Sequence, residues 1–310
     1  MSEPVLVGVD WGTSSFRACL IDRSGAVLDR LSAPAGILQV PPGGFEARLR
    51  ELLGTWLADH PRLPLILSGM VTSRQGWCEL PYLPCPVGPE RLARALATLR
   101  LADGRTVHLV PGLSARRPDG LPDVLRGEET QILGAIAEIP EARTIVLPGT
   151  HSKWVTIEAG EVRGFSTFMT GELFAVLMAH SILGRLARGE AEEEGFARGV
   201  RVGLRPEAGS GGTLARLFSA RALVLAGELR EEAVASYLSG LLIGSELREA
   251  AALGGPHGPV VLVGEPALVA RYARALELAG RAHLPASSDA AARGQYRLAR
   301  LAGLVDAGSP

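Results

Sequence analysis

The sequence predicts an α/β protein made of two related lobes. Two stretches of the chain each show three short strand patterns separated by turns, the first at residues 5–33 and the second at residues 144–168. The two stretches begin roughly 140 residues apart, and each leads into helices and further strands. A repeat of this length indicates two copies of one folding unit rather than an array of short repeats. We therefore expect an N-terminal lobe at residues 1–140 and a C-terminal lobe at residues 141–310.

After the first three strands, helix and strand patterns alternate through the N-terminal lobe. The predicted elements are a helix at 45–58, a strand at 64–69, a loop rich in Gly and Pro at 70–89, a helix at 89–99, a strand at 106–112, a polar loop at 114–127 and a helix at 128–137. This alternation is typical of α/β folds.

The C-terminal lobe is expected to be mostly helical after its three strands. The helical pattern covers residues 171–252 and is interrupted by a polar, Gly-rich segment at 205–212. A strand and a helix follow at 260–277. We expect a final helix at 288–302 to pack back on the N-terminal lobe.

The composition excludes several classes of protein. The 32 basic and 33 acidic side chains nearly cancel, so no net field favours DNA, RNA or an anionic membrane surface. No window approaches the roughly 18 to 20 apolar residues that span a bilayer, and the first residues lack the pattern of a secretory leader. Three cysteines are an odd set that we expect to be free thiols. The expected location is cytoplasmic, without a nucleic-acid or membrane partner.

The turn after the first strand contains residue types that bind phosphate. Asp10 ends the strand, and a glycine and three hydroxyl side chains follow, at Gly12, Thr13, Ser14 and Ser15. Gly12 allows the backbone to approach an anion closely, and the amides and hydroxyls after it are donors to phosphate oxygens. Asp10 is a candidate Mg²⁺ ligand, partly through water, because this ion keeps much of its hydration shell. Taken alone, the segment also fits an ordinary hairpin with an acidic end.

The corresponding turn of the second meander supports the phosphate interpretation. It supplies a glycine, two hydroxyls and a cation, at Gly149, Thr150, Ser152 and Lys153. Lys153 is the only lysine in the chain, and it directly follows the turn. Two such turns that face each other can clamp a polyphosphate. Lys153 as a solvated strand residue is the alternative.

Transfer of a phosphoryl group to an alcohol requires a group that receives or orients the hydroxyl proton. Glu128 and Glu129 follow a glycine at the start of a predicted helix and are the candidates, with Asp123 as a third choice. The sequence does not decide between the two glutamates. Both also fit as favourable charges in the first turn of a helix.

The loop rich in Gly and Pro is a candidate recognition segment. It contains Arg74, Gln75 and Trp77, and loops of this kind frequently carry binding residues. Arg74 can grip a carboxylate through its planar guanidinium, which favours a sugar acid as acceptor. Arg126, beside the candidate base, is expected to assist. A packing role that anchors the loop is the alternative for Trp77.

Five segments together resemble the 2-dehydro-3-deoxygalactonokinase family, within the sugar kinase/Hsp70/actin superfamily. They extend from near the N-terminus to beyond the middle of the chain and read GVDWGTSSFRA, GMVTSRQGW, PDVLRGEETQILGA, LPGTHSKW and FMTGELFAVL. The resemblance implies two ribonuclease H-like lobes with a nucleotide cleft between them. It also implies that ATP and Mg²⁺ are used to phosphorylate the 6-hydroxyl of 2-dehydro-3-deoxy-D-galactonate in D-galactonate catabolism.

The resemblance further implies an adenosine-side motif at Gly264 and Glu265, after a strand of the C-terminal lobe. One departure is visible, because Pro148 stands before Gly149 where the superfamily usually has an acid. A second metal-binding aspartate is therefore not expected.

Other functions remain open from the sequence. These are another sugar or sugar-acid kinase, a polyphosphate or nucleotide hydrolase, and a non-catalytic ATP-binding module. Contact between two copies of the chain through the helical second half, giving a homodimer, is a further expectation.

Overall fold

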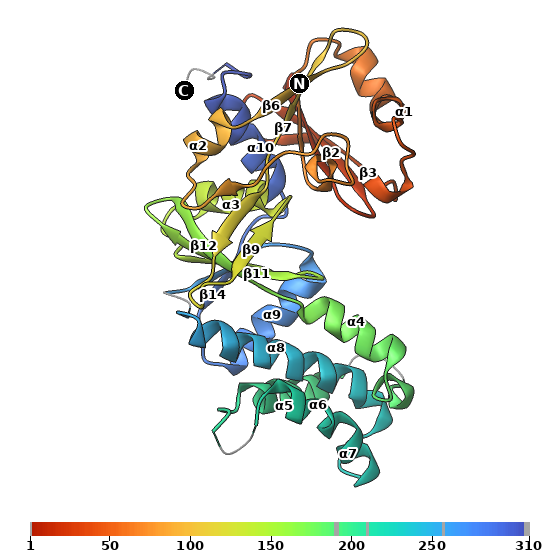
Figure 1. Cartoon of the computed structure of the whole chain (residues 1–310), viewed down its shortest axis with the longest axis vertical. Helices are drawn as coiled ribbons and strands as arrows, with labels where there is room; N and C mark the ends of the chain where they lie inside the picture. The colour runs from red at the N-terminus through yellow and green to blue at the C-terminus, as the bar shows by residue number, and fades with distance from the viewer. Residues whose placement is uncertain (1, 189–191, 209–210, 256–257, 307–310) are drawn as a thin grey trace.

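The computed structural model describes residues 2–188, 192–208, 211–255 and 258–306. It forms an elongated molecule with a six-stranded sheet at one end and a group of helices, α4 to α8, at the other (Figure 1). None of the helices in these ranges is long and apolar enough to cross a bilayer.

The N-terminal sheet is built around the strand that contains Asp10. Its strands, in spatial order, are β3 (Val27–Ala33), β2 (Phe16–Asp22), β1 (Pro4–Trp11), β4 (Leu65–Ser68), β7 (Thr106–Leu109) and β6 (Ala97–Arg100). The first three strands form the expected antiparallel meander, and β4 joins β1 in parallel with Asp10 opposite Ser68. The carboxyl ends of two central strands therefore meet beside Asp10.

The second sheet repeats this plan. Its order is β12 (Glu161–Phe168), β11 (Ser152–Glu158), β10 (Thr144–Leu147), β13 (Val260–Leu262) and β14 (His283–Pro285). Again an antiparallel meander is followed by a parallel neighbour of its first strand. The prediction of two related strand patterns is thus confirmed in space. The short edge strand β14 was not predicted.

Two local predictions in the N-terminal lobe are wrong. The predicted helix at 89–99 ends early, as α2 (Pro89–Arg94), because residues 97–100 alternate inward and outward as an edge strand paired with β7. The expected polar loop at 114–127 contains a hairpin of β8 (Leu113–Arg116) and β9 (Pro122–Leu125). Its turn is closed by Gly120, whose positive φ suits glycine. Together with β5 (Leu83–Pro84), this hairpin forms a third, three-stranded sheet.

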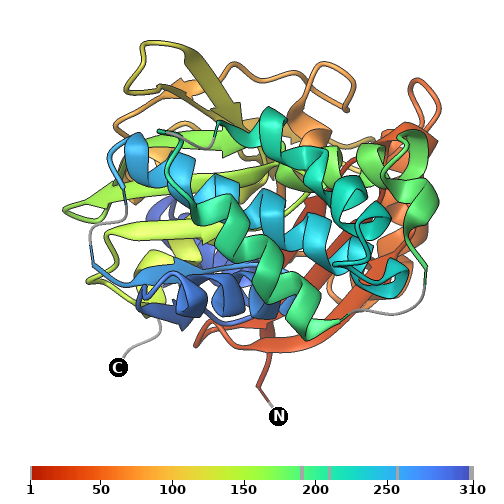
Figure 2. The same ribbon diagram turned by 90° about the horizontal axis from the view of Figure 1, so that it is seen from below.

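The remaining helices are arranged in two groups. The bounds are α1 (Phe45–Asp59), α3 (Glu128–Glu138), α4 (Thr170–His180), α5 (Glu193–Leu204), α6 (Thr213–Leu217), α7 (Ser219–Leu225), α8 (Val234–Ala252), α9 (Pro266–Leu278) and α10 (Ala290–Leu301), with short 3₁₀ helices at Ile37–Gln39, Met70–Thr72, Gly184–Leu186 and Glu231–Ala233. Helices α5 and α8 pack along each other at the end of the molecule that lies opposite the six-stranded sheet, and Figure 2 shows them side by side. The long apolar α8 forms the centre of this group.

Helices α3 and α10 form a layer between the two large sheets. One apolar cluster contains residues of both sheets as well as these helices, including Leu6, Ile132, Ile145 and Leu298. The helices approach closely because Gly294 faces the Thr130 carbonyl, where an added Cβ would lie 1.8 Å from the oxygen. The C-terminal helix α10 therefore lies against elements of the N-terminal lobe (Figure 1).

Candidate active site

Asp10 lies at the end of β1, in a space bordered by two glycines. A Cβ on Gly69 would lie 2.9 Å from the Asp10 Oδ1 atom, and one on Gly127 would lie 4.0 Å from it. Both glycines have a positive φ, +95° and +108°, which other residues rarely adopt. The chain thus keeps side chains away from this carboxylate on two sides.

The electrostatic surroundings of Asp10 suit a cation. Its side chain is only 19% exposed, and among the residues that the structure describes it forms one ion pair, with Arg17 at 3.7 Å. Burial raises the pKa of Asp10 to about 6, while Arg17 lowers the pKa and the nearby Glu128 raises it. A partly buried carboxylate beside a second acid is stabilised when a divalent cation binds. No group of three or more acidic, histidine or cysteine side chains within the described ranges forms a metal cluster.

The first predicted phosphate turn is held from behind by a second segment. The Gly12 amide donates to the Ser15 carbonyl at 2.9 Å, and the Ile37 amide donates to the Gly12 carbonyl at 3.0 Å. The side chains of Thr13 and Ser14 are exposed. The turn is therefore fixed by its backbone while its hydroxyls remain available.

The second predicted phosphate turn carries Lys153, the only lysine of the chain. Its side chain is 6% exposed, and its Nζ lies 3.4 Å from a Glu128 carboxylate oxygen and 3.2 Å from the His151 carbonyl. An added Cβ on Gly149 would meet nothing closer than 3.9 Å, and Thr150 is exposed. The Lys153–Glu128 pair joins the C-terminal sheet to α3. It places this turn near Asp10, which also lies close to Glu128.

The two candidate bases have different environments. Glu128 keeps 25% of its side chain exposed and accepts a bond from the Arg126 amide at 3.0 Å. Glu129 is 1% exposed and accepts from the Gly127 amide at 2.7 Å, while its Oε1 has no partner among the described residues. Burial is the main cause that raises the pKa of Glu129 to about 8. Glu128 is therefore the more accessible of the two carboxyl groups, whereas burial favours the neutral form of Glu129 at pH 7.

This difference predicts a pH-dependent stability. The folded-state pKa of Glu129 lies above its ordinary value of 4.5, so the folded state binds the proton more tightly. This tighter proton binding increases the unfolding free energy at low pH, and the increase is lost as the pH rises through about 8. Between pH 5 and 8 we expect the wild type to lose more unfolding free energy than Glu129→Gln, by on the order of 3 kcal/mol. Urea unfolding at both pH values measures this, and parallel losses in the two proteins would contradict it.

The predicted recognition loop is anchored by two of the residues expected to bind substrate. Trp77 stacks on Phe45 with ring centroids 6.1 Å apart and is half-buried. Arg126 is buried, and its two terminal nitrogens donate to both oxygens of Thr72 at 2.6 Å and to the Leu80 carbonyl at 2.8 Å. The guanidinium also lies 4.3 Å from the centre of the Tyr82 ring.

Of the four residues predicted to bind substrate, Arg74 and Gln75 are the two that are exposed and therefore open to a ligand. Asp123, the third candidate base, is likewise engaged. Its carboxylate accepts bonds from the amide and hydroxyl of Thr167, both at 2.7 Å, and so ties β9 to β12.

The anchoring by Arg126 predicts a loop defect when its geometry is changed. A lysine cannot reproduce a planar donor that serves several acceptors at once. We expect Arg126→Lys to lower the unfolding free energy by about 2 kcal/mol, to speed amide exchange at residues 72–80, and to raise the KM of the acceptor more than that of the nucleotide. Arg116→Lys is the matched control, because exposed Arg116 donates only to the Gly120 carbonyl. Unchanged exchange in the loop of Arg126→Lys would refute the anchoring role.

A pocket of about 190 Å³ adjoins the second turn. Its walls come from the turn, α4, α8 and α9 and comprise Gly149, Thr150, Thr170, Gly171, Phe174, Ser239, Leu242, Ile243, Leu268, Arg271 and Tyr272. Among the predicted adenosine-side residues, Gly264 precedes α9 with a φ of +151°. The Glu265 carboxylate caps α9 by accepting from the amides of Ala267 and Leu268. Glu265 therefore orients the helix that lines the pocket.

Glu246 of α8 binds Tyr272, a residue that lines this pocket, and was not predicted from the sequence. Its buried carboxylate accepts from Ser152 Oγ and Trp154 Nε1, both at 2.7 Å, and from the Tyr272 hydroxyl at 2.6 Å. It thereby joins β11, α8 and α9. An acid inside the otherwise apolar run of α8 is the sequence signal that could have revealed it.

The chain is similar to known proteins over most of its length. The family model described as 2-keto-3-deoxy-galactonokinase matches residues 10–298. A Rhizobium meliloti (strain 1021) protein named "Probable 2-dehydro-3-deoxygalactonokinase" is 40% identical over 278 residues, which cover 88% of this chain and 89% of the relative. The Escherichia coli (strain K12) 2-dehydro-3-deoxygalactonokinase is 34% identical over 275 residues, which cover 88% and 90%.

Solved structures give the same result for the fold. The crystal structure of a Sinorhizobium meliloti protein assigned to the 2-dehydro-3-deoxygalactonokinases matches with a TM-score of 0.85 at 37% identity, covering 95% of this chain and 98% of that one. The (R)-2-hydroxyglutaryl-CoA dehydratase component A of Acidaminococcus fermentans matches with a TM-score of 0.51 at 12% identity, which shows the fold alone. The expected fold of sugar kinases and actin is confirmed, and the chain belongs to the 2-keto-3-deoxy-galactonokinase family.

Proposed function

We propose that the protein transfers the γ-phosphoryl group of ATP to the 6-hydroxyl of 2-dehydro-3-deoxy-D-galactonate, giving 2-dehydro-3-deoxy-6-phosphogalactonate in D-galactonate catabolism. The observation that carries the proposal is the meeting of Asp10, Glu128 and Lys153 between two glycine-containing turns. Membership of the kinase family supports the choice of acceptor.

The residues at the end of β1 fit a magnesium ion. Asp10 is a partly buried carboxylate with a raised pKa, its ion pair with the largely exposed Arg17 is long at 3.7 Å, and glycines leave space beside it. A single protein carboxylate suits Mg²⁺, which keeps several waters and also binds substrate phosphates. When bound, the ion neutralises charge on the phosphates. Asp10 is the residue that we assign to hold it.

The two turns and Lys153 are assigned to the phosphates of ATP. The exposed hydroxyls of Thr13, Ser14 and Thr150 are available as donors, and Gly12 and Gly149 permit close approach of the backbone. Lys153 supplies the positive charge on the C-terminal side. The pocket beside Gly149 is the proposed site for the adenosine.

Glu128 is assigned to receive the proton of the acceptor hydroxyl. It is accessible, and its ion pair with Lys153 and its bond from the Arg126 amide fix its orientation. In-line positioning of the hydroxyl and the phosphate accounts for most of the rate in this kind of reaction. Exposed Arg74 is the proposed partner of the substrate carboxylate, with Gln75 beside it.

The position of Gly171 predicts a defect in nucleotide binding. An added Cβ there would lie 2.4 Å from the Gly149 carbonyl oxygen, so Gly171→Ala must push α4 away from the second turn. We expect the KM for ATP to rise about tenfold or more, equivalent to about 1.4 kcal/mol of binding. Gly164→Ala in β12, where a Cβ meets nothing within 4 Å, is the control. An unchanged KM for ATP in a folded Gly171→Ala protein would show that the second turn does not contribute to nucleotide binding.

A substrate panel tests the function itself. ADP formation is measured with Mg²⁺ and ATP against 2-keto-3-deoxy acids and neutral hexoses. We expect rapid ADP formation only with 2-dehydro-3-deoxy-D-galactonate among them. Activity on glucose alone would indicate a hexose kinase, and phosphate release without any acceptor would indicate a hydrolase; either outcome would overturn the proposal.

A further inference from the structure

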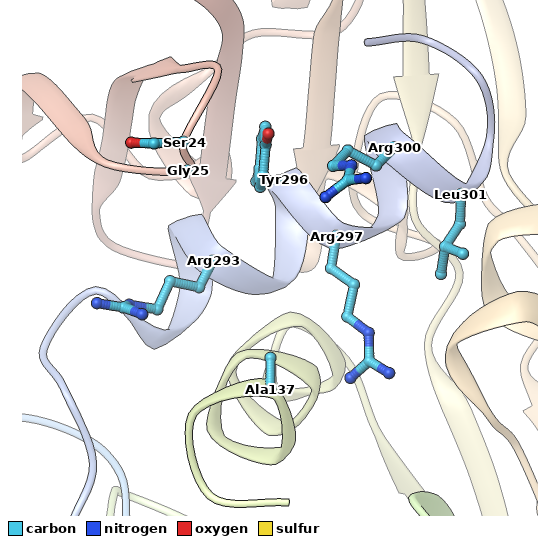
Figure 3. A pocket seen from close by; sticks show the side chains of 8 residues that line it. All are labelled: Ser24, Gly25, Ala137, Arg293, Tyr296, Arg297, Arg300 and Leu301. Atoms are coloured by element: carbon cyan, nitrogen blue, oxygen red, sulfur yellow. The ribbon is translucent and has the colours of Figure 1, made fainter. Parts of the chain in front are cut away.

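A second pocket lies on α10, away from the residues assigned to the phosphates. Its volume is about 450 Å³, and its walls come from the turn between β2 and β3, from α3 and from α10. Figure 3 shows the residues that line it: Ser24, Gly25, Ala137, Arg293, Tyr296, Arg297, Arg300 and Leu301. This volume is within the range of small-molecule sites.

The lining carries three positive charges and no negative charge. Arg293, Arg297 and Arg300 recur at helical spacing, so that they share one face of α10. In Figure 3, Arg297 extends past Ala137 of α3, while Arg300 folds back toward Tyr296. None of the three forms an ion pair with any residue that the structure describes.

The acids next to the pocket along the chain are engaged elsewhere. Asp289, before α10, pairs with Arg30 at 2.5 Å. Glu138, which follows Ala137, accepts the Ser287 amide at 3.1 Å. Within the described part of the chain, the three arginines therefore have no carboxylate partner of the kind that normally balances a guanidinium group at a protein surface.

The chemistry of the lining identifies the ligand class. Guanidinium groups bind phosphate and carboxylate through paired hydrogen bonds. The Tyr296 ring, Ala137 and Leu301 add apolar wall, and the Tyr296 hydroxyl is already bonded to the Arg23 carbonyl. Such a site suits a small organic anion that carries both a phosphate and a carboxylate. A phosphorylated sugar acid has this composition, and it is the class of compound that the proposed reaction produces.

The opposite face of α10 contacts the strand that contains Asp10. Gln295 Nε2 donates to the Val9 carbonyl at 2.8 Å and to Ser68 Oγ at 3.0 Å. A Cβ on Gly8 would lie 2.2 Å from Gln295 Oε1, so the side chain is wedged against β1. Through these contacts, a shift of α10 on ligand binding would move the backbone beside Asp10, and thermodynamic linkage would make the effect reciprocal.

We infer that this arginine pocket is a regulatory site that binds a phosphorylated sugar acid and inhibits the kinase through α10. The regulatory part rests on the proposed function, whereas binding of the anion to the pocket does not.

Binding is tested by calorimetric titration of the whole chain. The probes are 6-phosphogluconate, gluconate and inorganic phosphate. The variant Arg293→Gln/Arg300→Gln changes two exposed side chains, and Arg62→Gln/Arg281→Gln removes the same charge from exposed positions elsewhere. We expect 6-phosphogluconate to bind the wild type and the control equally, and the pocket variant at least tenfold more weakly. The inference would be overturned if 6-phosphogluconate bound all three proteins equally or was weakened equally in both variants. It would also be overturned if the wild type bound inorganic phosphate as tightly as 6-phosphogluconate.

Regulation is tested by initial rates with and without 6-phosphogluconate. We expect inhibition of the wild type and the control, and no inhibition of the pocket variant, whose uninhibited kcat stays within about twofold of the wild type. Inhibition that persists in the pocket variant would place the effect at the active site and contradict the regulatory role. If the chain lacks the proposed kinase activity, the titration still decides whether the pocket binds the anion.

Discussion

Asp10→Asn is expected to lower kcat by about a thousandfold or more, corresponding to about 4 kcal/mol of transition-state stabilisation. The amide keeps the shape of the side chain but loses the charge that we assign to hold Mg²⁺. The loss should not be recovered at high Mg²⁺ concentration. Steady-state rates at several Mg²⁺ concentrations measure it, with Asp59→Asn, at the exposed end of α1, as the control.

The same substitution should make the folded protein more stable. The folded-state pKa of Asp10 is about 6, above its ordinary value of 3.8, so the carboxylate destabilises the fold progressively as the pH rises through 6. At pH 8 we expect Asp10→Asn to gain on the order of 2 kcal/mol in unfolding free energy. An inactive but stabilised protein indicates a functional carboxylate. A destabilised Asp10→Asn, or one with near wild-type kcat, would contradict the assignment.

Glu128→Gln is expected to lower kcat by about 10²- to 10⁴-fold, because an amide cannot receive the hydroxyl proton. Glu129→Gln should change kcat by less than about tenfold. Glu129 is held neutral by burial, with a pKa of about 8, so glutamine resembles the form already present at pH 7. The adjacent positions thus provide a matched pair. Single-turnover rates at pH 7 separate the chemical step from product release.

The two adjacent variants decide which glutamate acts. A large loss in Glu129→Gln with a mild loss in Glu128→Gln would reverse the assignment. Since Glu128→Gln also leaves Lys153 without its carboxylate partner, thermal unfolding must accompany the kinetics. A folded Glu128→Gln protein that retains most of its kcat would exclude Glu128 as the base.

Much of the fold follows from local sequence patterns. The two meanders were predictable because alternating apolar residues and short glycine turns specify hairpins within about ten residues of chain. The third sheet was not predictable in the same way. The strand pattern of residues 122–125 is short and polar, and its hairpin is completed by the Asp123–Thr167 contacts to β12, which are 44 residues away along the chain.

The sequence predicted which residue types form the candidate site, but it did not predict the separate role of each residue. The sequence placed Glu128 and Glu129 together and gave no means to distinguish them, because their difference arises from burial against distant segments. Arg126 was expected at the substrate, whereas its terminal nitrogens hold Thr72 and Leu80. The network of Glu246 joins residues that are up to 94 positions apart, and only the folded chain brings them together.

Amide exchange of the whole chain, with and without Mg²⁺ and a non-hydrolysable ATP analogue, tests whether the phosphates bind between the two turns. If the two turns clamp the phosphates, residues 11–15 and 149–153 should both become protected, and Asp10→Asn should lose this Mg²⁺-dependent protection. Protection of only one turn, or of neither, in wild-type protein saturated with the nucleotide would contradict a phosphate site between the lobes.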